Sequence, residues 1–199
     1  MVPQRIWRHT STSHLRGFSL IELLVVVAIF TLLSIVTIAS NASFGERITL
    51  ETLAYDVALS VRQAQVYGIA VQRFGSSGTD FDRGYGMHFD VSTGPSSATY
   101  ELFADTLSGN GLYDDGELVA ATTLRGGYRI VDLCVRPNGG SENCDISELN
   151  ILFKRPEPDA YIRSEDTSPT YELGRITIES PSGDRADVVV ELSGQISVQ

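Results

Sequence analysis

One acidic residue, Glu22, stands inside a long apolar stretch of the sequence. From Phe18 to Ala39 it is the only charged residue. A carboxylate in such a segment is costly unless an opposite charge neutralises it, so Glu22 predicts a cationic partner. The chemistry expected at this position is charge pairing in apolar surroundings.

Two cysteines form a second candidate for chemistry. Cys134 and Cys144 are the only cysteines, and they enclose a turn-rich segment, residues 135–143. Such a segment favours a local disulfide. A zinc site is the alternative, but it needs further ligands, and His88 is the only histidine after residue 17.

A third candidate is the acidic, glycine-rich segment 104–117, which fits an EF-hand-like calcium loop with Gly111 at the sixth position. The first position of that frame should be aspartate, but it is occupied by Thr106, and Asp105 lies one residue earlier. A solvated turn is the alternative, because these residue types also favour turns. Calcium is the one cofactor that the sequence suggests, and its ligands would be Thr106, Ser108, Asn110, the Leu112 carbonyl, Asp114 and Glu117.

Neither catalysis nor nucleic-acid binding is expected. His88 stands without a Gly-x-Ser-x-Gly motif, so a serine triad has no support and we expect no enzyme. The net charge is -10, and without the three arginines of residues 1–17 the balance is 12 basic against 25 acidic residues, or -13. An acidic surface repels phosphate backbones, which makes nucleic acid an unfavourable partner.

The apolar stretch predicts a membrane-spanning helix over residues 18–40. At ~1.5 Å per residue its apolar core is ~33 Å long, enough to cross a bilayer core of ~30 Å. Arg5, Arg8 and Arg16 precede it, so the positive-inside rule puts the N-terminus in the cytoplasm. An ordinary secretory signal cut after Ala42 is an alternative, though its apolar region should be shorter. A plain single-pass anchor is another.

After the span, residues 41–68 carry apolar positions at helical spacing and predict an amphipathic continuation of the helix, ended by Gly68. Residues 69–199 predict an extracytoplasmic domain of short antiparallel strands, packed on Leu53, Val57 and Val61. The expected fold class is α+β. The expected strands are Ile69–Arg73, Gly86–Asp90, Thr99–Ala104, Leu118–Thr123, Tyr128–Cys134, Asn150–Arg155, Arg175–Ser180, Ala186–Leu192 and Gln195–Val198.

At Gly17-Phe18-Ser19-Leu20-Ile21-Glu22 the chain resembles type IV prepilins and pseudopilins. The resemblance implies that prepilin peptidase removes a leader, residues 1–17, by cutting after Gly17, and that the new amine of Phe18 is methylated. It also implies that Glu22 is the glutamate typical of the family. The amine of Phe18 on a neighbouring subunit would then be the partner that Glu22 requires.

The resemblance implies a pilin-like fold and a structural role. The chain would be a minor pilin or pseudopilin of the cytoplasmic (inner) membrane, assembled with other pilin subunits into a type IV pilus or a type II secretion pseudopilus. Residues 53–71 are similar to the corresponding part of H-type pseudopilins and related minor pilins. The rival hypotheses are a DNA-uptake minor pilin, which would need a basic face, and a membrane-anchored outer domain of other function.

Overall fold

The computed structural model describes residues 17–70, 83–92, 98–107, 109–165 and 170–199, without the side chains of residues 39–44. The chain divides into two compact units, residues 1–42 and 43–199. Helix α1 (Leu20–Ile69) contributes to both. In the first unit it supplies Leu20–Ile38, a segment of 19 residues that is long and apolar enough to cross a membrane and of which no part is buried. The expected helix and its amphipathic continuation are thus one element.

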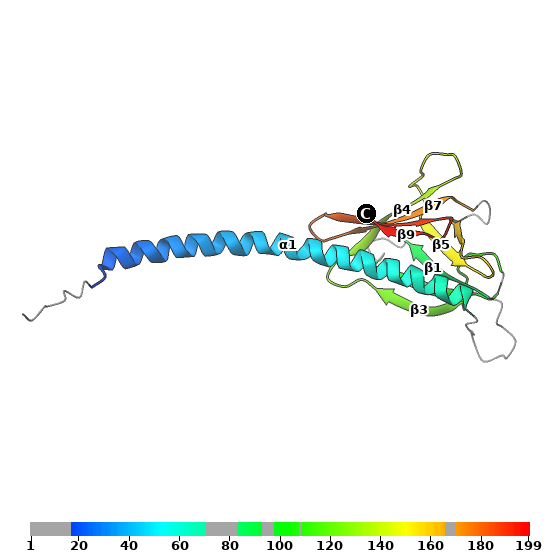
Figure 1. Ribbon diagram of the computed structural model, residues 1–199, viewed down its shortest axis with the longest axis horizontal. Helices are drawn as coiled ribbons and strands as arrows, with labels where there is room; N and C mark the ends of the chain where they lie inside the picture. Colours follow the sequence, from blue (N-terminus) through cyan, green and yellow to red (C-terminus); the bar gives the residue numbers. More distant parts are fainter. Residues whose placement is uncertain (1–16, 71–82, 93–97, 108, 166–169) are drawn as a thin grey trace, which may run out of the picture. The chain divides into compact units, whose positions relative to one another are not determined.

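The second unit packs the rest of α1 against strands (Figure 1). Its buried positions recur every three or four residues, which keeps them on one face of the helix. Leu53, which we expected in this buried row, is only partly buried and flanks it. The buried row consists of Leu50, Ala54, Val57, Val61 and Ala64.

All nine strands of the described part belong to two antiparallel sheets. The five-stranded sheet has the order β3-β2-β1-β5-β6, and the four-stranded sheet has the order β4-β7-β8-β9. The chain enters the second sheet at β4, returns to the first for β5 and β6, and then completes the second as a meander. The strands are β1 (Gly84–Asp90), β2 (Thr99–Asp105), β3 (Leu118–Thr123), β4 (Arg129–Arg136), β5 (Glu148–Phe153), β6 (Ala160–Arg163), β7 (Leu173–Glu179), β8 (Arg185–Glu191) and β9 (Ile196–Val198).

The α+β, pilin-like fold class is confirmed, but three details of the prediction were wrong. Ile69 is the last residue of α1 and starts no strand, while residues 71–73 of that expected strand lie outside the described residues. Strand β6 was missed, because only four residues form it. Gly68 does not end the helix: a Cβ there would lie 2.2 Å from the carbonyl O of Phe153, so glycine is needed for close packing on β5.

Candidate functional site

The residues of the N-terminal motif lie just before and inside the first turn of α1. Gly17 and Phe18 precede the helix, and the helix begins at Leu20, where the N–H of Leu23 donates to the carbonyl O of Ser19 at 3.1 Å. Phe18 is 80% exposed, and a Cβ on Gly17 would meet no atom within 4 Å. As far as the described residues show, both residues that flank this peptide bond are exposed.

Glu22 lies in the first turn of α1, where the unpaired N–H groups of the helix favour a negative charge. Its side chain is exposed. Among the ion pairs of the described residues, none includes Glu22. The cation that this carboxylate requires in apolar surroundings must therefore come from outside the described part of this chain.

The side chains that follow Glu22 present a continuous apolar surface. Within Leu20–Ile38 no other charge occurs, and large residues such as Phe30 and Ile38 are each more than two-thirds exposed. An apolar surface of this extent is unstable in water and marks contact with lipid or with other apolar helices.

Comparison with known families agrees with this geometry. The family model of the prokaryotic N-terminal methylation motif matches residues 13–38, which include Gly17, Phe18, Glu22 and the apolar part of α1. Over these residues the chain carries the N-terminal motif of type IV pilin-like proteins, and the apolar helix that follows supports that relationship. The apolar part of α1 together with this motif fits the membrane anchor of a pilin-like precursor, and the motif implies processing by prepilin peptidase and assembly with pilin subunits in general. No curated protein and no solved structure gives a significant match.

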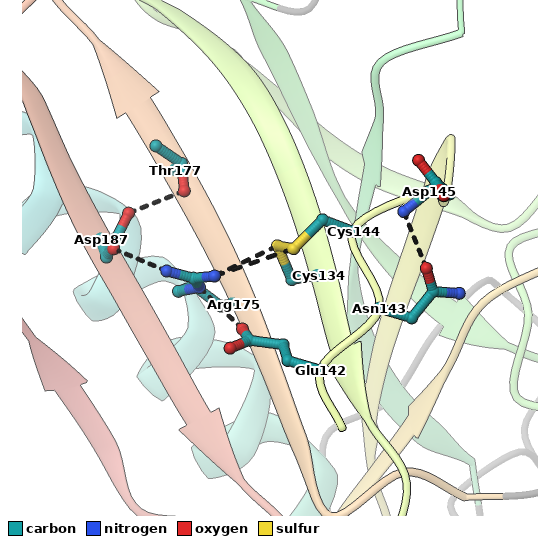
Figure 2. The surroundings of a disulfide bond; sticks show 8 residues. All are labelled: Cys134, Glu142, Asn143, Cys144, Asp145, Arg175, Thr177 and Asp187. Atoms are coloured by element: carbon teal, nitrogen blue, oxygen red, sulfur yellow. Dashed lines mark hydrogen bonds and ion pairs between the residues drawn. A yellow bond between two sulfur atoms is a disulfide. The ribbon is translucent and has the colours of Figure 1, made fainter. Parts of the chain in front are cut away.

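The second unit contains the expected disulfide. Cys134 and Cys144 are joined, and the bond fastens the 137–144 loop to β4 (Figure 2). Cys134 is fully buried and Cys144 is exposed. Next to the bond, Val135 and Asn143 exchange two backbone hydrogen bonds of 2.8 Å. The disulfide and these two hydrogen bonds thus attach the loop to β4 at the same place.

Arg175 on β7 connects this loop to the sheet. Its Nη2 lies 3.4 Å from the Sγ of Cys134, its Nε lies 2.8 Å from Oε1 of Glu142, and its Nη1 lies 3.2 Å from Oδ2 of Asp187 (Figure 2). Burial lowers the pKa of Arg175, but the two carboxylates outweigh it and the net shift is upward. The arginine therefore stays charged and bridges the loop to β8.

Among the described residues, one compact group has side chains of the kinds that bind metal ions, and it includes both cysteines of the disulfide. Asp132, Cys134 and Cys144 have ligand atoms within 4.8 Å of one another. Both sulfurs are already bonded to each other and offer no thiolate, so this group is a poor metal site.

The predicted calcium loop connects β2 to β3, and Glu117 organises it. The fully buried carboxylate of Glu117 accepts backbone N–H bonds from Thr106 at 2.6 Å, Leu107 at 2.7 Å and Asp114 at 3.2 Å. Glu117 is therefore the anchor that closes the loop, a role for which its sequence position gave no signal. Ser108 lies outside the described residues. Calcium binding by the expected ligands stays a prediction.

The loop covers the outer face of the five-stranded sheet. Tyr113 packs on Phe103 and on His88, with ring centroids 5.8 and 4.7 Å apart, and its N–H donates to Oδ1 of Asn150 at 3.2 Å. His88 lies on β1, as expected, and its Nδ1 is 2.9 Å from the same Asn150 oxygen. The loop is thus packed against the sheet through Tyr113.

Asp105, at the end of β2, is a buried acid that the predicted EF-hand frame did not include among its ligands. It is only 6% exposed, and its Oδ2 accepts the N–H of Gly111 at 3.0 Å. Burial raises its pKa; the N–H groups of Gly111 and Gly109 oppose that rise, and the charges of Glu117 and Asp114 add to it. In the sequence, the sign that Asp105 deserved notice was its position one residue before Thr106, the first ligand position of the EF-hand frame.

Proposed function

We propose that this chain is a minor pilin or pseudopilin, a structural rather than catalytic subunit of a type IV pilus or a type II secretion pseudopilus. In this proposal prepilin peptidase cuts between Gly17 and Phe18, and the new amine of Phe18 is methylated. The anchor lies in the inner membrane with the N-terminus in the cytoplasm and residues 43–199 outside. The observation that carries the proposal is the match to the methylation motif at residues 13–38.

The pairing of Glu22 with an amine explains how assembly sets its register. Glu22 is the single charge of the apolar segment Leu20–Ile38, and no cation of the described residues neutralises it. A processed neighbour supplies one at Phe18. Burial of an unpaired carboxylate among apolar helices is strongly unfavourable, so only arrangements that bring the two charges together are stable.

A second apolar surface supports assembly through α1 beyond the membrane segment. Ile48, Tyr55, Leu59 and Val66 are each more than half exposed and lie opposite the buried row of the helix. Their spacings of seven, four and seven residues form a continuous stripe along the helix. The stripe fits packing against the helix of another subunit, which would extend the contacts that the apolar segment makes.

Mass spectrometry of the mature N-terminus tests processing. The chain is expressed in cells that contain a prepilin peptidase, and membranes are extracted and digested. We expect a first peptide that begins at Phe18 and carries one methyl group on its amine. A chain that still begins at Met1, or one that begins after Ala42, would contradict the proposal.

Substitution of Glu22 tests the assembly mechanism separately. We expect Glu22→Ala and Glu22→Gln to be cut normally but to be absent from sheared filaments, since both remove the charge. Glu51, an exposed glutamate of the same helix beyond the anchor, provides the matched control, and Glu51→Gln should assemble. Normal incorporation of Glu22→Ala would refute the charge pairing while leaving the processing result intact.

A further inference from the structure

The dipeptide Asn-Gly occurs twice in the chain, at residues 110–111 and 138–139. An asparagine followed by glycine can lose ammonia without any enzyme. The backbone nitrogen of the glycine attacks the side-chain amide carbon of the asparagine, and glycine has no side chain to obstruct that approach. In a folded protein the reaction depends on whether the two groups are free to meet.

Asn138 lies in the 137–144 loop, and its amide is unrestrained. The N–H of Gly140 donates to the carbonyl O of Pro137 at 3.0 Å, which closes a β-turn. Asn138 and Gly139 are the two central residues of this turn, and both are exposed. Among the hydrogen bonds of the described residues, none uses the side chain of Asn138 or the N–H of Gly139. The attacking and the attacked group are therefore both available.

The turn has space to move, but the base of its loop is fixed. Gly139 has φ of 70°, and a Cβ added to it would meet no atom within 4 Å. The peptide can therefore rotate without displacing a neighbour. Below the turn, the disulfide between Cys134 and Cys144 and the hydrogen bonds between Val135 and Asn143 hold the loop on β4. A chemical change in the turn is thus confined to the loop.

The other Asn-Gly pair is held by hydrogen bonds on every group that the reaction needs. The N–H of Gly111, a buried residue, donates to Oδ2 of Asp105 at 3.0 Å. The side-chain Oδ1 of Asn110 accepts the N–H of Leu112 at 2.8 Å. The backbone carbonyl O of Asn110 accepts Nη1 of Arg163 at 2.6 Å, which fixes the peptide between the two residues. The nitrogen of Gly111 is therefore kept away from the amide carbon.

We propose that Asn138 is a site of spontaneous deamidation and that the fold protects Asn110 from the same reaction. A bond forms between the nitrogen of Gly139 and Cγ of Asn138. The bond from Cγ to the amide nitrogen breaks, and ammonia leaves with the proton of the attacking nitrogen. Water then opens the five-membered ring on either side, which gives aspartate or isoaspartate. The reaction consumes only water.

The product changes the charge of an exposed loop. It adds one negative charge to a chain whose net charge is -10, in a loop where Glu142 already pairs with Arg175 at 2.8 Å (Figure 2). Because the turn is exposed and the loop is closed at its base, the fold should accommodate the new carboxylate. Asn138→Asp should therefore melt within about 2 °C of the unmodified chain. A larger loss would show that the loop does not tolerate the product.

The experiment follows both asparagines in one sample. The full chain, purified in detergent with its disulfide intact, is kept for several weeks at mildly alkaline pH, since removal of the proton from the attacking nitrogen speeds the reaction. Samples are reduced and digested with trypsin, which leaves Asn110 in the peptide 84–125 and Asn138 in the peptide 130–154. Mass spectrometry measures the gain of one mass unit, and fragmentation assigns it to a residue. Asn138→Gln is the control and should remove the signal from its peptide.

In the folded chain we expect Asn138 to convert at least about tenfold faster than Asn110, because Asn110 reacts only after Gly111 leaves the Asp105 carboxylate. In urea, after reduction of the disulfide, both should convert at comparable rates. An unreacted Asn138, or equal conversion of both residues in the folded chain, would overturn the proposal. Slow conversion of Asn110 in urea as well would refute the protective role of the fold.

Discussion

Gln65 holds α1 to two separate turns of the second unit, and its removal should be far more damaging than its polar character suggests. The side chain is 3% exposed, and its Nε2 donates to the carbonyl O of Pro158 at 3.0 Å and of Gly194 at 3.1 Å. Its Oε1 accepts from Arg62. The helix, the β5–β6 connection and the β8–β9 turn therefore meet at this one amide.

The expected cost of Gln65→Ala follows from these contacts. Pro158 is exposed, so its carbonyl can return to water, and the lost bond is worth about 1 kcal/mol. Gly194 is buried, so its carbonyl would be left unsatisfied at a cost of about 1–3 kcal/mol. The free energy of unfolding should fall by about 2–4 kcal/mol, which lowers the melting temperature by about 4–16 °C.

Near-UV circular dichroism of the tyrosines provides the assay, because the single tryptophan, Trp7, lies outside the second unit. Gln63 is the matched control: it is exposed on the same helix, and Gln63→Ala removes only its bond to the hydroxyl of Tyr67. That variant should change the free energy of unfolding by about 0.5 kcal/mol or less. If the two variants had the same melting temperature, the buried amide of Gln65 would not be what attaches the helix to these turns.

Two further predictions concern the second sheet. Replacing Cys134 and Cys144 together by serine should lower the free energy of unfolding by about 2.5–3 kcal/mol, from the loop entropy of their separation of 10 residues; thermal unfolding compared with the unmodified, oxidised chain measures this, and equal stability would contradict it. Hydrogen bonds from Arg129 and Arg185 hold the pKa of Glu179 below its usual 4.5. The stabilisation is complete above that value and is lost as the pH falls through the lower folded pKa. In Glu179→Gln the free energy of unfolding should therefore fall less between about pH 5 and 3 than in the unmodified chain. An equal fall in both chains would argue against these bonds.

The sequence alone determined the features that depend on local pattern. Glu22 in its apolar segment, the helical spacing that buries Val57 and Val61, and the turn at Ser193-Gly194 each follow from residue type and periodicity. The disulfide could also be predicted from the sequence, because both cysteines lie in one short segment. Each of these signals lies within a short stretch of sequence, so it can be interpreted without knowledge of the rest of the fold.

Only the tertiary structure decided which distant segments meet. The division of the strands into two sheets depends on pairings such as β1 with β5, far apart in the sequence. Gly68 looked like a helix end, but its role comes from the approach of Phe153. Only the structure shows that three backbone N–H groups surround the Glu117 carboxylate and that Asp105 is buried. Burial and long-range contact set the energetic role of a polar residue, and neither is encoded in its neighbours along the chain.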